Sequence, residues 1–530
     1  MAIKGRTILR IGAVAVGLAA LGWNHFHQRA ASTSAADDAT VAAATTVSKP
    51  AAPTKPRTWQ LGSLTLTPCE LGQPNSGLST AAWCAPFEVP ENRDDPHSRK
   101  ISLKLAVIRS SAQVAAKDML VMLAGGPGQA ATESWQGVST ALQPLTAHRH
   151  VVLLDQRGTG GSNPLTCKAE SKDTPADEDG DDLEFNPAKL RAETALCVKQ
   201  LEGKADPRYY TSTIAVQDLE DVRKALGSPT FDLVGVSYGT RMAQQFAMRH
   251  PEAVRSLVLD GVVPNELVLG EDFAVNLDDA LKGQFARCSA DPTCHQRFND
   301  PYQTLYQLRD ALRANPHEVS FRDPQTYQTV KRELNEFSLA SVVRMFAYSP
   351  LTAALLPVSI DAAAHGDVGP LLGQAKLLSG DLSDTMNGGM QSSVICSEDA
   401  DLLTPRPQDA HTILGTRMID TLQAVCSVWP KGTRPADFHE PLKTDKPTLL
   451  LSGQYDPVTP PRYGEAVAKN LSQSRHLVLT GQGHNVINAG CAPDIVKHFI
   501  EDTNPKALDV KCLNLLQATP MFIDFNGATP

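Results

Sequence analysis

Residues 231–240 read Phe-Asp-Leu-Val-Gly-Val-Ser-Tyr-Gly-Thr, and this stretch decides the fold. The apolar residues before Ser237 are typical of a buried parallel strand, and Met242 and Phe246 follow at helical spacing until Pro251. The pattern predicts a strand, a tight turn and a helix. Gly-x-Ser-x-Gly at such a turn is typical of a serine nucleophile, because the glycines let strand and helix pack closely while the hydroxyl stays exposed.

A second apolar run, at 119–124, ends in Gly-Gly-Pro-Gly at 125–128. A turn without side chains at the end of a central strand allows a backbone N–H to point into a cleft, where it can stabilise the oxyanion of a tetrahedral intermediate. We expect the two oxyanion donors to be the N–H of Gly126 and the N–H of Tyr238, the residue after the serine.

Two later strands end in candidate partners for the serine. Asp456 follows the apolar run that begins at Lys446, and His484 follows the run that begins at His476. Because the carboxyl ends of parallel strands meet at one edge of a sheet, we expect both side chains near Ser237. The chain order Ser, Asp, His is that of an α/β-hydrolase triad, which requires neither a cofactor nor a metal ion.

The order of the predicted elements indicates an α/β fold. Strands and helices alternate up to residue 260, as a mostly parallel, doubly wound sheet requires. Helical periodicity then dominates, which predicts a large, mainly helical lid inserted after the sixth core strand. The expected organisation is a signal peptide or signal anchor at 1–30, a disordered linker at 31–57, the first part of the core at 58–263, the lid at 264–444, the rest of the core at 445–515 and a tail at 516–530.

Composition and the N-terminal segment bear on location. The formal net charge is -9 and no Lys/Arg-rich run occurs, so nothing indicates nucleic-acid binding. Basic residues precede an apolar run at 11–23, which is typical of an export signal, either cleaved or kept as a membrane anchor. We therefore expect a periplasmic or extracellular protein, and no sequence feature specifies its oligomeric state.

The ten cysteines also favour export, because an even number of cysteines in sequence-local pairs suggests disulfides formed in an oxidising compartment. Pairing of nearest neighbours is the simplest interpretation, although a sequence alone leaves the connectivity open. The pairs would be Cys69 with Cys84, Cys167 with Cys197, Cys288 with Cys294, Cys396 with Cys426 and Cys491 with Cys512.

The motifs together resemble those of the prolyl aminopeptidase-like serine peptidases, and within that group the secreted tripeptidyl aminopeptidases. The resemblance covers roughly residues 60 to 515 and implies the triad Ser237, Asp456 and His484 in an exopeptidase that removes short N-terminal peptides. Ala124 stands where the prolyl aminopeptidases carry His, which argues against strict proline release. The motifs are Gly-Gly-Pro-Gly at 125, Asp-Gln-Arg-Gly-Thr-Gly at 155, Gly-Val-Ser-Tyr-Gly-Thr at 235, Gly-x-x-Asp-Pro-Val-Thr-Pro at 453 and Gly-x-Gly-His at 481.

An aminopeptidase must hold the free ammonium group of its peptide substrate, which requires carboxylates in a closed pocket. Glu398 and Asp399 are the candidates, with Glu266, Glu271 and Asp272 behind them. Two other functions are compatible with the motifs. One is a secreted carboxylesterase that uses the same triad, and the other is a binding protein that kept the fold and lost turnover.

Overall fold

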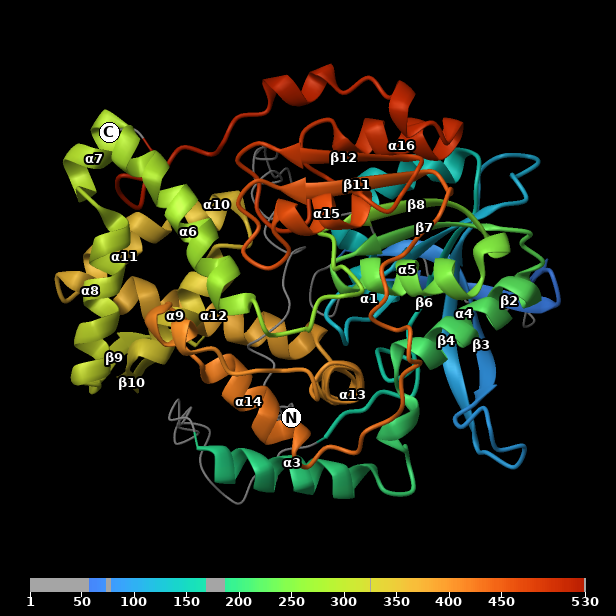
Figure 1. Ribbon diagram of the computed structural model, residues 1–530, viewed down its shortest axis with the longest axis horizontal. Helices are drawn as coiled ribbons and strands as arrows, with labels where there is room; N and C mark the ends of the chain where they lie inside the picture. The colour runs from blue at the N-terminus through green and yellow to red at the C-terminus, as the bar shows by residue number, and fades with distance from the viewer. Residues whose placement is uncertain (1–56, 73–77, 168–185, 325, 529–530) are drawn as a thin grey trace, which may run out of the picture.

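The computed structural model describes residues 57–72, 78–167, 186–324 and 326–528. Within them the chain forms a ten-stranded sheet in the order β1-β2-β3-β4-β6-β5-β7-β8-β11-β12, and the six strands from β6 to β12 are parallel (Figure 1). The strands are β1 Trp59–Leu61, β2 Leu64–Leu71, β3 Thr80–Pro90, β4 Lys100–Ile108, β5 Met119–Leu123, β6 Val151–Leu154, β7 Phe231–Val236, β8 Val254–Asp260, β11 Thr448–Gly453 and β12 Ser474–Leu479.

Helices cover both faces of this sheet, and each face has its own apolar core. One core joins the sheet to α4 (Ser212–Leu226) and α5 (Tyr238–Arg249). The other joins it to short helices after β5 and to α16 (Ala492–Asp502). The prediction of a mostly parallel α/β sheet with helices on both faces is therefore confirmed. The short helices are α1 Ala131–Ser134, η2 Trp135–Gly137, α2 Ser139–Leu142 and η3 Gln143–Ala147.

Two strands more than expected precede the insertion. The single strand expected at 60–66 is a hairpin, β1 and β2, which turns at Gly62 with φ of 60°. Strand β3 was not predicted, because Pro86 lies within it and proline argues against an interior strand. The insertion therefore follows the eighth strand of the chain, β8, rather than the sixth.

The segment between β8 and β11 is mainly helical, as expected, but it divides into two parts. Helices α6, α8, α9, α11 and α12 and a two-stranded antiparallel sheet share a separate apolar core in the left-hand lobe of Figure 1, and α7 and α10 pack in a small cluster of their own. Helices α13 and α14 belong to the core of the main sheet instead. The bounds are α6 Phe273–Ala290, α7 Pro292–Phe298, α8 Pro301–Ala314, β9 His317–Arg322, β10 Thr329–Leu334, α9 Glu336–Phe346, α10 Pro350–Ala354, α11 Leu356–Ala364, α12 Gly369–Thr385, α13 Gly388–Glu398, η6 Pro407–His411 and α14 Arg417–Cys426.

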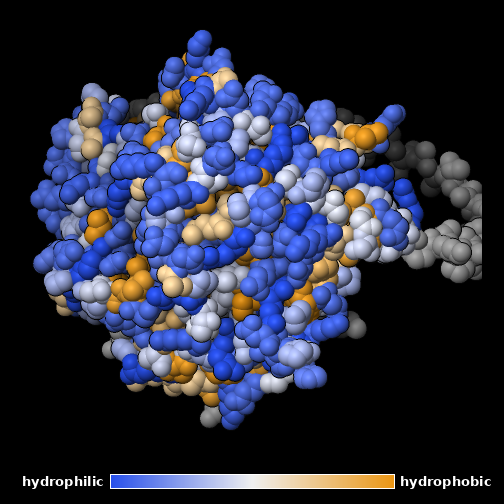
Figure 2. Space-filling view, turned by 45° about the vertical axis from the view of Figure 1, so that its right-hand side comes forward, coloured by the Kyte–Doolittle hydropathy of each residue, from blue (hydrophilic) through white to orange (hydrophobic). Residues whose placement is uncertain are grey.

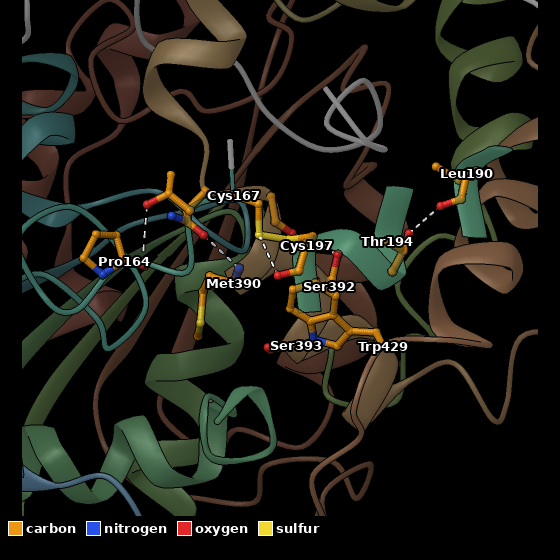
Figure 3. The surroundings of a disulfide bond; sticks show 12 residues. Pro164, Cys167, Leu190, Thr194, Cys197, Met390, Ser392, Ser393 and Trp429 are labelled. Atoms are coloured by element: carbon orange, nitrogen blue, oxygen red, sulfur yellow. Dashed lines mark hydrogen bonds between the residues drawn. A yellow bond between two sulfur atoms is a disulfide. The ribbon is translucent and has the colours of Figure 1, made fainter. Parts of the chain in front are cut away.

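Five disulfides join the cysteines as nearest-neighbour pairing predicts. The Cys167–Cys197 bridge fixes the chain after β6 to α3 (Pro187–Leu201), and the indole of Trp429 lies beside it, donating from Nε1 to the Ser393 hydroxyl at 2.9 Å (Figure 3). The bridge between Cys396 and Cys426 ties α13 to α14. The first bridge thus holds α3 on the chain that follows β6, and the second holds α13 against α14.

The C-terminal residues run from the sheet to the inserted lobe (Figure 1). The Phe522 N–H donates to the Ala354 carbonyl at 3.0 Å, and Met521 packs with Phe298 in a small apolar cluster. The remaining helices are η4 Pro207–Tyr209, η5 Pro251–Ala253, α15 Pro461–Ala468, η7 Pro505–Ala507 and η8 Lys511–Leu515. No helix among the described residues is long and apolar enough to span a membrane. The expected export signal and linker lie outside these residues, and the outer surface is largely hydrophilic in the view of Figure 2.

Candidate active site

Ser237 lies in a tight turn between β7 and α5, with φ of 55° and ψ of −124°. The glycines of the motif are required by close packing. A Cβ on Gly239 would lie 2.1 Å from the carbonyl oxygen of Leu123, and one on Gly235 would lie 2.4 Å from the carbonyl oxygen of Gly239. Side chains at these positions would push strand and helix apart, so the sequence holds the serine in a strained but well-supported conformation.

The structure brings the three predicted side chains together. His484 Nε2 lies 3.0 Å from Ser237 Oγ, and His484 Nδ1 lies 2.7 Å from Asp456 Oδ2. All three residues follow the carboxyl ends of parallel strands, β7, β11 and β12, and each is at least nine-tenths buried. These distances suit proton transfer from the hydroxyl to the imidazole, with the carboxylate fixing the opposite ring nitrogen.

Asp456 is held as an ionised acceptor. Burial opposes its charge, but the charge of His484 and hydrogen bonds from His484 and from the N–H groups of Thr459 and Val458 keep the pKa of Asp456 below its usual value. Sequence reasoning did not assign a role to Thr459. Its hydroxyl lies 2.8 Å from Asp456 Oδ2 and 3.1 Å from His484 Nδ1, so it contacts both members of the pair.

His484 is also fixed by groups outside the triad. Its backbone N–H donates to the Tyr348 carbonyl at 2.8 Å, and the Tyr348 ring meets the imidazole edge-on with centroids 5.3 Å apart. On another side lies Gly261, with φ of 68°, where an added Cβ would be 3.0 Å from His484 Cε1. Tyr348 comes from the insertion and no sequence pattern marked it. Gly261 directly follows a predicted strand.

The expected oxyanion loop lies against the serine. A Cβ on Gly125 would be only 3.1 Å from Ser237 Cβ, so the loop after β5 touches the nucleophile. Tyr238 is the first residue of α5, where N–H groups have no acceptor within the helix. Among the described residues neither the Gly126 nor the Tyr238 N–H donates to a protein acceptor. Both donors are therefore available to a substrate oxygen.

The structure gives Glu398 and Asp399 partners inside the protein. Glu398 is fully buried and accepts from the Ser212 N–H at 2.5 Å and the Ser212 hydroxyl at 2.8 Å, and burial raises its pKa to about 8. Asp399 is equally buried and pairs with Arg241 at 3.0 Å. Neither carboxyl faces open space, so no contact supports the expected role in binding a substrate ammonium, which stays a prediction.

The three further candidates for binding a substrate ammonium, Glu266, Glu271 and Asp272, differ in burial and in hydrogen-bond partners. Glu266 is exposed, while Glu271 is half-buried, with a pKa raised by burial and by the neighbouring charge of Asp272. Asp272 accepts from Arg406 and from the Tyr463 hydroxyl. No group of three or more His, Cys, Asp or Glu side chains arranged to hold a metal ion occurs in the described part of the chain.

Comparison with known proteins agrees with this geometry. The family model described as alpha/beta hydrolase fold matches residues 118–487, which include every member of the Ser-His-Asp arrangement. The chain belongs to the alpha/beta hydrolase fold family. The resemblance noted in the motifs is thereby confirmed, and the hydrolase is a serine hydrolase of this fold.

Three curated relatives are similar to the hydrolase. The serine protease Hip1 of Mycobacterium tuberculosis H37Rv is 26% identical over 485 residues, covering 84% of this chain and 90% of the relative. Carboxylesterase B of the same organism is 24% identical over 461 residues, covering 81% and 86%. The tripeptidyl aminopeptidase of Streptomyces lividans is 26% identical over 212 residues, covering 38% of this chain and 39% of that protein.

Proposed function

We propose that the hydrolase is an exported serine exopeptidase that releases short peptides, tripeptides in particular, from free N-termini through an acyl-enzyme. The observation that supports it is the pair of hydrogen bonds that joins the side chains of Ser237, His484 and Asp456. The names of two relatives, a serine protease and a tripeptidyl aminopeptidase, favour peptide substrates. The five disulfides are typical of proteins that fold in an oxidising compartment outside the cytosol.

In the proposed mechanism His484 Nε2 accepts the Ser237 proton as Oγ attacks the substrate carbonyl carbon. Asp456 fixes the tautomer through Nδ1 and stabilises the imidazolium that forms. The imidazolium then protonates the leaving amine, and the acyl group stays on Ser237 as an ester. Water, deprotonated by His484, attacks this ester and releases the peptide with a new carboxylate.

The oxyanion of each tetrahedral intermediate would lie between the N–H groups of Gly126 and Tyr238. One donor comes from the loop after β5 and the other from the first turn of α5, so both are held by elements of the rigid core. Such donors contribute most when they are already oriented before the charge develops, because no reorganisation is then needed.

The proposal is tested with a fluorophosphonate probe and two substrates. Wild-type protein should be labelled, and Ser237→Ala should not. A tripeptide p-nitroanilide with a free N-terminus should be cleaved, and its N-acetylated form should be cleaved much more slowly. Equal turnover of the free and acetylated anilides would contradict the exopeptidase assignment, whereas absence of labelling in the wild type would contradict the serine hydrolase mechanism and favour a non-catalytic binding protein.

A carboxylesterase is the second candidate, and the similarity to a carboxylesterase over most of the chain favours it. The triad and oxyanion donors serve both reactions, so the difference lies in the acyl pocket. A short p-nitrophenyl ester supplies the comparison. Rapid hydrolysis of this ester with no cleavage of the free peptide anilide would establish the esterase and exclude the peptidase.

A further inference from the structure

Asp260 is a buried acid beside the triad that the proposed mechanism does not use. It is the last residue of β8, the strand that lies between the nucleophile strand β7 and the acid strand β11. Its neighbours in the sheet are Val236 and Leu451, both apolar, and its exposed fraction is 0%. A buried carboxyl in such surroundings needs several hydrogen-bond donors to remain charged.

The main chain of Asp260 holds the nucleophile turn. Its carbonyl oxygen accepts the N–H of Ser237 at 2.8 Å. Ser237 has a positive φ, which is costly for a residue with a side chain and persists only when neighbouring contacts fix it. The Asp260 carbonyl also accepts from the Asn485 side-chain amide at 3.2 Å. This one oxygen atom therefore accepts from Ser237 and from the residue that follows His484.

The side chain of Asp260 holds the segment that follows His484. Oδ1 accepts the Val486 N–H at 2.8 Å, and Oδ2 accepts the same N–H at 3.0 Å and the Ile487 N–H at 3.1 Å. The two peptide groups are thus anchored to the end of β8 by a single carboxylate. Because they come directly after His484 and Asn485, their position restrains the backbone that carries the imidazole.

We propose that Asp260 is a positioning residue, which ties the nucleophile turn to the histidine loop and so sets the separation of Ser237 and His484. The inference rests on the proposed function, since it concerns the efficiency of the proton transfer between these two side chains. It requires the ionised carboxylate. A protonated carboxyl would turn one oxygen into a donor with no acceptor in this arrangement, and the two N–H groups would lose part of their anchorage.

The pH dependence of activity should reveal this requirement. Burial raises the pKa of Asp260 to about 6, against the hydrogen bonds from Val486 and Ile487 and the charge of His484, while the charge of Asp456 raises it further. His484 and Asp456 are the titratable groups that face it. As the pH falls through this range, protonation of Asp260 would weaken its hold on the histidine loop, so the acid limb of log kcat/KM should be steeper in the wild type than in a variant without this carboxylate.

The decisive variant is Asp260→Asn, and Asp232→Asn is its matched control. Asp232 lies in β7, is fully buried, and burial raises its pKa also to about 6. It accepts from the Ser256 hydroxyl at 2.5 Å and from Arg255 at 2.8 Å, near the start of the strand and away from Ser237. Both variants exchange a buried carboxylate for an amide, but only one of them touches the histidine loop.

We expect Asp260→Asn to lower kcat by about 10- to 100-fold and the rate of fluorophosphonate labelling by a similar factor, as a misplacement on the order of 1 Å would. KM should change by less than about threefold, and the acid limb of kcat/KM should be shallower than in the wild type, because position 260 then carries no titrating group. Asp232→Asn should keep the wild-type kcat and slope. Unchanged kcat and slope in Asp260→Asn, or equal losses in the control, would overturn the proposal.

Asn485→Gly keeps the experiment decisive if Asp260→Asn does not fold. Asn485 has φ of 63°, which glycine adopts freely, and the substitution removes only the side-chain bond to the Asp260 carbonyl. A severalfold drop in kcat at constant KM supports the proposal, and an unchanged kcat refutes it. Labelling of wild-type protein is measured alongside, so that failure of the serine hydrolase mechanism is recognised separately.

Discussion

The substitution Gly261→Ala should damage catalysis much more than folding. Gly261 has φ of 68°, and an added Cβ would lie 2.8 Å from Asn485 Nδ2, 3.0 Å from His484 Cε1 and 3.2 Å from Thr459 Oγ1. All three neighbours belong to the site or contact it, so a shift of several tenths of an ångström falls on the imidazole. The left-handed backbone alone costs about 1 kcal/mol with alanine.

Gly203→Ala separates these two effects. Gly203 has φ of 74°, and no heavy atom lies within 4 Å of an added Cβ. Both variants should lose about 1 kcal/mol of unfolding free energy in urea titrations. Only Gly261→Ala should lose activity, with kcat reduced about tenfold or more and KM nearly constant, because a displaced imidazole accepts the serine proton less well. The reasoning fails if kcat is the same in the two variants.

The remaining three predictions concern Thr459 and Glu398. Thr459→Val removes the hydroxyl that contacts both Asp456 and His484, and it should lower kcat about fivefold, equivalent to ~1 kcal/mol. Thr459→Ser keeps a hydroxyl and should retain most of the wild-type kcat. Equal kcat in the two variants would show that the hydroxyl is dispensable. Because burial raises the pKa of Glu398 to about 8 from a usual value of 4.5, the folded state holds its proton more tightly, so its contribution to stability is present below about pH 4.5 and is lost as the pH rises towards about 8. From pH 5 to pH 8 the wild type should therefore lose stability relative to Glu398→Gln, so that the free energy of unfolding of the variant minus that of the wild type increases. A pH-independent difference would contradict the shift. Assays of the same variant on free and acetylated peptides test the ammonium role, for which a selective rise in KM with the free peptide is required and equal losses count against it.

The sheet could be predicted where strands are apolar on both faces. The parallel strands β5, β7 and β8 are short, mostly apolar runs followed by turns that contain glycine, and such runs have few alternative structures in a soluble chain. Strand β3 escaped prediction, since a proline inside a strand usually excludes a central position and here pairing with β2 and β4 overrides it. The hairpin of β9 and β10 escaped because its residues are mostly polar and exposed.

The adjacency of Ser237, Asp456 and His484 could be predicted because each follows a strand end, and strand ends of a parallel sheet converge. Thr459 carried a local signal, as it lies three residues after Asp456 at the spacing of a carboxylate that caps a turn. Tyr348 carried none. Its contact with His484 joins residues that are far apart in the chain, and only the packing of the insertion determines it.

The insertion contacts the candidate active site at two separate loops, which restricts how a substrate can enter. At the histidine loop the Tyr348 carbonyl accepts the His484 N–H. At the loop after β5 the Asn387 N–H donates to the Gly128 carbonyl at 3.0 Å, and Met386 Sδ would lie 3.2 Å from a Cβ at Gly128. Rigid withdrawal of the whole insertion would break both contacts and remove one support from His484 and one from the loop after β5. An entry route that preserves the catalytic geometry must therefore leave these two contacts in place.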